Sequence, residues 1–415
     1  MNRNSTKYAL GCLKVFLLLV VSYLAFACVA CLVPDKPVQE HIYQSVHQGD
    51  LQEDYPRAVL PKKQCQMDNF TDALILNQAY RCSKDSLLVS MLEVWRATDR
   101  CASVDVLRNE TEGRVESSYP YPRYWHGSTF LMRIMLLFTN YTSIRMLMFV
   151  VSMLLLLWAA YGFAKAANPL LALLMVLSLA VMNVHVMMFS IQFFPVLALA
   201  LIGVVLVCRL HDDSRRLTVA LFVIGSLTAY FDLLTTPLIT LGIPLCCLFA
   251  IKSSIGTVGW TRQLLLGTET GFMWAVGYGA TWIGNWLIAG ALTRFNAVED
   301  AVGQVAVRSS GLDDYSRLDA VMKNLDFMPW QYLIITLVVL AVMMLVRGWS
   351  GRWRSSLLLL LVSLIPIGWF LFAANHSYEH WWFTYRELMI SIMALLFAVG
   401  ILVATPKQKE PSASI

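Results

Sequence analysis

The sequence predicts an all-helical, polytopic membrane protein with about ten transmembrane helices and both termini on the cytoplasmic side. Three observations lead to this prediction. Of the 415 residues, 58% are hydrophobic and only 14% are charged, a composition that excludes a soluble globular enzyme, a disordered tail and a coiled coil. The apolar residues gather in about ten runs, and a helix needs about 20 such residues to cross a bilayer. Lysine and arginine are concentrated at every second connection between these runs.

The first apolar run, Ala9–Val33, is predicted to be a retained membrane anchor. It is too long for the core of a signal peptide and does not end in a small-x-small cleavage site. Nine later runs predict the remaining transmembrane helices. They lie at Ser143–Ala164, Asn168–His185, Phe193–Cys208, Leu217–Phe231, Leu233–Ile251, Leu264–Leu292, Tyr332–Val346, Ser356–Ala374 and Arg386–Ala404.

The basic residues predict which side of the membrane each connection faces. Lys and Arg beside short connections are retained on the cytoplasmic side. With the N-terminus inside, the short outer connections 186–192, 232–236 and 375–384 contain no Lys or Arg. The predicted cytoplasmic flanks contain Arg3, Lys7, Lys165, Arg209, Arg215, Arg216, Lys252, Arg262, Arg347, Arg352, Arg354, Lys407 and Lys409. The overall charge of +5 includes no basic run that could follow a phosphate backbone, so we expect no nucleic-acid partner.

This topology divides the chain into membrane and outer regions. The regions are an anchor at 1–33, a first outer segment at 34–142, spans 2–7 at 143–292, a second outer segment at 293–330, spans 8–10 at 331–404 and a cytoplasmic tail at 405–415. Because the cytoplasmic loops are short, we expect any chemistry on the outer side.

The two outer segments are predicted to fold into short helices that lie on the membrane above a cavity. Apolar spacing in Asn69–Leu92, broken near Cys82–Asp85, predicts two helices. Phe130–Phe138 is too short to cross the bilayer and is expected at the interface or as a re-entrant segment, with its Arg133 reaching water or an anion. In the second segment, apolar residues from Ala297 to Val305 repeat at helical spacing, and Asp313–Leu325 predicts another helix.

Two carboxylates in the first outer segment are candidate catalytic groups. Asp68 and Asp72 lie four residues apart, which places them on one face of a helix. Their mutual repulsion would raise one pKa or favour a bound divalent cation. The structural alternative is that Asp68 is an N-cap and Asp72 an acidic residue of the first helical turn.

The aromatic segment Tyr119–His126 is the second candidate. Prolines hold it extended, and its rings could stack on a sugar or a lipid, with Arg123 binding a phosphate. The alternative is an aromatic belt at the membrane interface. The candidate binding residues of this segment are Arg123, Tyr124, Trp125 and His126.

Further candidates lie at two short outer connections. Asp232 stands between two apolar runs, where it is either a site residue or a helix cap. His376 and His380 are four residues apart, a spacing that could bind a metal but more simply serves hydrogen bonds to sugar hydroxyls or a phosphate. Arg386 would supply the countercharge for the phosphate, or form a structural ion pair.

The nine cysteines define no framework. Those in apolar runs, Cys31 among them, are interpreted as small hydrophobic residues. Cys65, Cys82 and Cys101 share the first outer segment, so one disulfide is possible there with one thiol left over.

The overall layout resembles the GT-C superfamily of integral-membrane glycosyltransferases. The similarity consists of one N-terminal span, a long outer segment with acidic residues, many further spans with short inner loops and a late second outer segment. The chain also resembles bacterial polytopic membrane proteins that carry DNFTD and YPRYWHG segments, which implies no function. In the GT-C family a carboxylate of the first outer loop acts as base or metal ligand. The matching residues here are Asp68 and Asp72, with Asp35 in reserve, although the family's carboxylate lies close after the first span.

The resemblance implies a membrane glycosyltransferase that uses a polyprenyl-phosphate-linked sugar at the outer face of a bacterial cytoplasmic membrane. The acceptor would be an envelope glycan, lipid or protein. Asp68 or Asp72 would act as the base, and Arg123 and Arg386 would bind the phosphate. Two alternatives remain open on the sequence: a transporter or flippase for a lipid-linked or small solute, and a non-enzymatic subunit of envelope assembly.

Overall fold

The computed structural model describes residues 3–49, 51–57, 62–82, 86–99, 101–115, 117–256, 259–310 and 315–403. Within these residues the protein is helical apart from one antiparallel pair, β1 (Arg96–Ala97) with β2 (Ser118–Tyr119). The predicted all-helical class is therefore confirmed. The predicted cytoplasmic tail, 405–415, lies outside the described residues.

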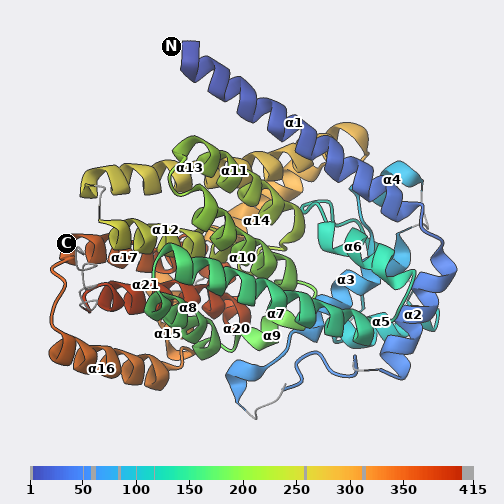
Figure 1. The fold of residues 1–415 in the computed structure, drawn as a ribbon. Coiled ribbons are helices and arrows are strands. Elements are labelled where there is room, and N and C mark those ends of the chain that lie inside the picture. Colours follow the sequence, from blue (N-terminus) through green and yellow to red (C-terminus); the bar gives the residue numbers. More distant parts are fainter. Residues whose placement is uncertain are drawn as a thin grey trace.

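The N-terminal part consists of one long helix followed by a cluster of short ones. The long helix α1 (Arg3–Cys31) leans away from the body of the protein at its N-terminal end (Figure 1). The short elements are α2 (Asp35–His47), η1 (Lys63–Cys65), α3 (Asn69–Arg81), α4 (Leu87–Leu92), α5 (Ser103–Thr111) and α6 (Gly127–Leu136). The predicted pair of helices in 69–92 is confirmed as α3 and α4.

The remainder of the chain forms a helical bundle, with two further short helices in the second outer segment. The bundle contains α7 (Tyr141–Ala166), α8 (Pro169–Val181), α9 (Val184–Met188), α10 (Phe193–Leu210), α11 (Ser214–Phe231), α12 (Ile239–Ile255), α13 (Trp260–Leu292), α16 (Trp330–Arg347), α17 (Trp353–Ser363), α18 (Ile365–Phe372), α19 (Ala374–Glu379), α20 (Trp381–Thr384), η2 (Tyr385–Glu387) and α21 (Leu388–Gly400). The helices of the second outer segment are α14 (Ala297–Ser309) and α15 (Arg317–Asp326). The predicted helix at 313–325 thus corresponds to α15, while its first two residues lie outside the described part.

Six segments are long and apolar enough to cross a membrane. They are Tyr8–Cys31, Tyr141–Ala166, Phe193–Leu210, Trp330–Arg347, Trp353–Phe372 and Trp381–Gly400. A helix occupies each of the other four predicted runs, but α8 and α12 have only 13 and 17 residues, and α11 and α13 are not among the six. These apolar helices are compatible with a multi-pass membrane protein, and the count of ten and the orientation stay predictions.

Arg133 of α6 joins the ends of α1 and α3. It is fully buried, so the expectation that it reaches water is wrong. Its guanidinium donates hydrogen bonds to the carbonyls of Ala30 (2.9 Å), Val33 (2.8 Å) and Ala79 (2.6 Å), and to the Asp35 carboxylate (3.0 Å). Carbonyls at helix C-termini lack partners within their own helix, and a guanidinium presents five donors. The other expectation, that Arg133 contacts an anion, is confirmed by its hydrogen bond to the Asp35 carboxylate.

Two glycines let α11 and α13 pack with their backbones in contact. A Cβ atom on Gly225 would lie 2.1 Å from the Trp274 carbonyl oxygen, and one on Gly277 would lie 2.1 Å from that of Phe222. No side chain fits at such distances. This close approach fixes the rotation of α13 and therefore the direction in which its aromatic side chains point.

Candidate functional site

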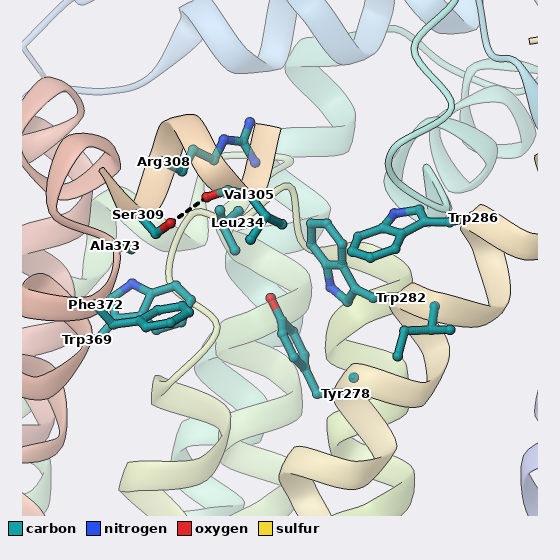
Figure 2. A pocket seen from close by; sticks show the side chains of 12 residues that line it. Leu234, Tyr278, Trp282, Trp286, Val305, Arg308, Ser309, Trp369, Phe372 and Ala373 are labelled. Carbon is teal, nitrogen blue, oxygen red and sulfur yellow. Dashed lines mark hydrogen bonds between the residues drawn. The ribbon is translucent and has the colours of Figure 1, made fainter. Parts of the chain in front are cut away.

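A cavity of about 310 Å³, which we call the aromatic cavity, lies between α13, α14, α18 and the connection from α11 to α12. Figure 2 shows Arg308 on one side of the space and Tyr278 on the other, with its hydroxyl directed inward. Trp282 and Trp286 stand opposite Trp369 and Phe372. The other lining residues are Leu234, Gly279, Ile283, Val305, Ser309 and Ala373.

One face of α13 forms an aromatic wall of this cavity. Trp274, Tyr278, Trp282 and Trp286 are spaced four residues apart, which aligns them along the helix. Successive ring centroids are 5.0, 6.0 and 5.5 Å apart. The sequence analysis missed these residues, although their regular four-residue spacing is a signal that could have identified them.

Arg308 supplies the only positive charge among the lining residues. Its guanidinium carbon lies 5.7 Å from the ring centroid of Tyr124. In the described part of the chain no carboxylate forms an ion pair with it. A half-buried guanidinium beside an apolar cavity, without a carboxylate to neutralise it, is a site for an anion.

The rim of the cavity is apolar and open to the surface of the protein. Ile283 is 52% exposed and Phe372 is 58% exposed, so a hydrocarbon chain could continue from the cavity over the surface. The buried indole nitrogen of Trp369 has no hydrogen-bond partner within the described structure. A ligand with an apolar tail and a polar head matches both features.

The predicted aromatic segment 119–126 is docked against α13 by its own polar groups. The Trp125 indole donates to the Thr281 carbonyl (2.7 Å), Asn285 donates to the Pro122 carbonyl (2.7 Å) and Trp286 donates to the Arg123 carbonyl (3.0 Å). These contacts leave the ring of Trp125 buried, where it serves packing.

Arg123, Tyr124 and His126 of this segment make different contacts, and only Tyr124 contacts a residue that lines the cavity. Arg123 forms an ion pair with Asp300 of α14 at 3.1 Å, so its charge is already neutralised. Tyr124 is buried with its ring centroid 5.2 Å from that of Trp282, next to the cavity wall. His126 donates to the Tyr121 carbonyl at 2.6 Å, and burial lowers its pKa to about 4, which keeps it neutral.

The two predicted histidines, His376 and His380, lie side by side, and His376 contacts Leu234. His376 donates from Nε2 to the Leu234 carbonyl (2.7 Å), and its ring centroid is 4.9 Å from that of His380. Burial, reinforced by the charge of Arg308, lowers the pKa of His380 to about 4. Burial also lowers the pKa of His376 well below its usual value. Both rings are therefore neutral at pH 7, and the Nδ1 atom of each has no partner in the described structure.

Asp232 holds the connection that contributes Leu234 to the cavity. Its carboxylate is buried and accepts hydrogen bonds from the Thr235 backbone N–H (3.0 Å) and from the Thr235 hydroxyl. Within this turn Leu234 has a φ of 66°, a left-handed conformation that is rare for a branched side chain. Asp232 is the residue that follows α11, and its carboxylate binds the turn at Thr235 rather than the first residues of α12, whose N-cap is Leu238.

Asp68 acts as the N-cap of α3 and contacts the bundle. Its carboxylate accepts a hydrogen bond from the Thr71 backbone N–H (3.0 Å) and another from the Gln192 side chain. Burial raises its pKa to about 7, and the charge of Asp72 contributes to the rise. The predicted elevation of one pKa is therefore present, with burial as its main cause.

Asp72 is buried beneath the N-terminus of α10. It accepts hydrogen bonds from the hydroxyls of Tyr141 and Ser190 and from the backbone N–H groups of Ile191 and Gln192. Both of its oxygens are thus occupied by donors of the protein. Burial raises its pKa as well.

Arg386 is buried beside the segment that precedes Asp68. It donates to the Gln66 carbonyl at 3.3 Å, and its guanidinium lies 5.3 Å from the Phe193 ring. Its Nε and Nη1 atoms have no hydrogen-bond partner in the described structure. It does not line the aromatic cavity.

The structure therefore separates the predicted site residues into groups. Tyr124 contacts Trp282 of the aromatic cavity, and His376 contacts Leu234. His380 lies beside His376. Asp68, Asp72 and Arg386 lie near one another through residues 66–72 and 190–193. Among the described residues no group of three or more His, Cys, Asp or Glu side chains could hold a metal ion.

Comparison of the chain with models of protein families, with curated proteins and with solved structures gives no match.

Proposed function

We propose that this protein is a membrane glycosyltransferase that binds a polyprenyl-phosphate-linked sugar in the aromatic cavity. The supporting observation is the combination of an apolar cavity of about 310 Å³ with one guanidinium, Arg308, that no described carboxylate neutralises. The lipid-linked phosphate has the same combination of one compact anion and a long hydrocarbon chain.

Each part of such a donor has a counterpart in the cavity. The phosphate would accept charge-assisted hydrogen bonds from Arg308. The isoprenoid chain would leave over the apolar rim at Ile283 and Phe372. The sugar would stack on the rings of Tyr278 or Trp282. The Nδ1 atoms of His376 and His380 have no partner in the described structure and would accept hydrogen bonds from hydroxyl groups only if the sugar reached past the residues that line the cavity.

The base that removes the proton from the acceptor hydroxyl remains assigned to Asp68 or Asp72. Asp68 is the stronger candidate, because its pKa of about 7 is near the pH at which a general base works. Neither residue lines the cavity, so the acceptor would approach from the side of α3. On that side Arg145 donates a hydrogen bond to the Asn69 side chain (3.4 Å), and Arg386 donates one to the Gln66 carbonyl (3.3 Å).

Donor binding is tested with the purified protein in detergent. Three tryptophans, Trp282, Trp286 and Trp369, line the cavity, so intrinsic fluorescence should change on addition of polyprenyl phosphate. Polyprenol, which lacks the phosphate, should bind more weakly. Arg308→Ala should weaken binding of the phosphate about 10- to 100-fold, as expected for charge-assisted hydrogen bonds of about 1.5–3 kcal/mol. The matched control is Arg294→Ala, an exposed arginine of the same outer segment.

Transfer is tested by incubation with labelled polyprenyl-phosphate hexoses and a cell-envelope extract. Asp68→Asn should abolish transfer and retain donor binding. Equal binding of polyprenol and polyprenyl phosphate, unaffected by Arg308→Ala, would refute the donor site. Binding of the donor without transfer of label to any envelope acceptor would favour the alternative function, a transporter or flippase for a lipid-linked solute.

A further inference from the structure

Two cysteines distant in the sequence meet at the junction of α1 with the first outer segment. Cys31 is the last residue of α1, and Cys82 follows the last residue of α3. Their Sγ atoms are 2.9 Å apart, and both side chains are buried. Cys65, Cys82 and Cys101 are all free thiols in this structure, and Cys82 contacts Cys31 rather than either of the other two. Cys65 contacts Asn183, and Cys101 is exposed.

We propose that Cys31 and Cys82 form a disulfide that joins the membrane anchor α1 to the end of α3. The two thiols are free in this structure, and their Sγ separation of 2.9 Å exceeds the disulfide bond length of about 2.0 Å by less than 1 Å. The position, at the predicted outer end of α1, is on the side of the membrane where disulfides persist.

The surroundings favour formation of this bond. Arg133 donates hydrogen bonds to the carbonyls of Ala30 and Val33, on either side of Cys31, and to that of Ala79, three residues before Cys82. It therefore holds the two chain ends in place. In the folded protein the pKa of the Cys82 thiol is lowered by its hydrogen bond with Cys31 and by the charge of Arg133, against the opposing effect of burial.

The chemistry is ordinary thiol–disulfide exchange with an external disulfide as the oxidant. The Cys82 thiolate attacks one sulfur of the oxidant and forms a mixed disulfide, and one oxidant thiolate leaves. The Cys31 thiol then loses its proton and attacks the Cys82 sulfur, and the second oxidant thiolate leaves. The protein loses two protons and two electrons, and the oxidant gains them as two thiols. Because both cysteines are buried, we expect this exchange during folding, before α3 packs against α1.

The bond would join two residues 51 positions apart and close a loop that contains α2, η1 and α3. It would also secure the small cluster in which Ala27, Ala30 and Phe130 pack around the two cysteines. The link would add a covalent bond at the C-terminal end of α1, where Arg133 already binds the carbonyls of Ala30 and Val33. This inference does not depend on the proposed glycosyltransferase function.

The test is differential alkylation of the full-length protein in native membranes, followed by peptide mass spectrometry. Free thiols are first blocked with N-ethylmaleimide, disulfides are then reduced, and the released thiols receive an isotopically distinct maleimide. The second label is expected on Cys31 and Cys82 in most chains, and Cys101 should carry the first label. A peptide pair linked through Cys31 and Cys82 should be found when the reduction step is omitted.

Three variants complete the experiment. Cys31→Ser should release Cys82 for the first label, whereas Cys101→Ser should leave the labels of Cys31 and Cys82 unchanged. Reduction of the wild-type protein should lower its thermal midpoint by several degrees, with no such change in the double variant C31S/C82S. Alkylation of both Cys31 and Cys82 by the first reagent in unfolded, unreduced wild-type protein would overturn the inference, and this measurement needs no variant to fold.

Discussion

Arg133 should contribute more to stability through helix-end carbonyls than through its ion pair. Replacing Arg133 with Met keeps the length of the side chain and removes every donor. The carbonyls of Ala30, Val33 and Ala79 then lose a buried partner, at about 1–3 kcal/mol each. The desolvation of the guanidinium is relieved at the same time, which offsets part of that loss. We expect a net loss of about 3–5 kcal/mol, the lower part of the range of about 3–9 kcal/mol for three carbonyls that lose their partner.

The matched comparison is Asp35→Asn. The Asp35 side chain is 37% exposed, and pairs accessible to solvent contribute about 1 kcal/mol or less. Arg133→Lys should fall between the two variants, because an ammonium group has three donors rather than five. The assay is thermal unfolding in mild detergent, followed by loss of the monodisperse peak in size-exclusion chromatography. If Asp35→Asn lowers the midpoint as much as Arg133→Met, the carbonyl contacts are not what stabilises this junction.

Three further outcomes are expected. Asp68 binds its proton more tightly in the folded protein than in the unfolded chain, because its folded pKa is about 7 against 3.8. Stability should therefore fall as the pH rises from about 4 through 7, and Asp68→Asn should flatten this dependence of the thermal midpoint; an equal slope in the variant would assign it to other groups. Gly277→Ala should destabilise the protein strongly, because its Cβ would meet the Phe222 carbonyl, whereas Gly279→Ala, with open space around it, should not; equal midpoints for the two variants would contradict the packing of α11 on α13. Asp72→Asn should lower the free energy of unfolding by about 2–4 kcal/mol, because the amide NH2 of asparagine is a donor and would face some of the four protein donors that now bind the carboxylate. An unchanged midpoint of chemical denaturation would be inconsistent with this network.

Local features of the sequence predicted the helices well. The apolar runs recur as helices, and the break between α3 and α4 falls where the apolar spacing is interrupted. The cap at Asp68 was one of two readings of its position, and the structure shows it, because an N-cap involves residues only three positions apart.

The composition and periodicity of the sequence determined the helical class and most of the helices, because each depends on residues within a few positions of one another. The tertiary structure alone decided which side chains surround the cavity. Arg308 meets Tyr124 across 184 positions of the chain, and Cys31 meets Cys82 across 51. Such contacts depend on how whole helices pack. No local pattern encodes that packing, and so the site predicted from single segments was divided between two places in the fold.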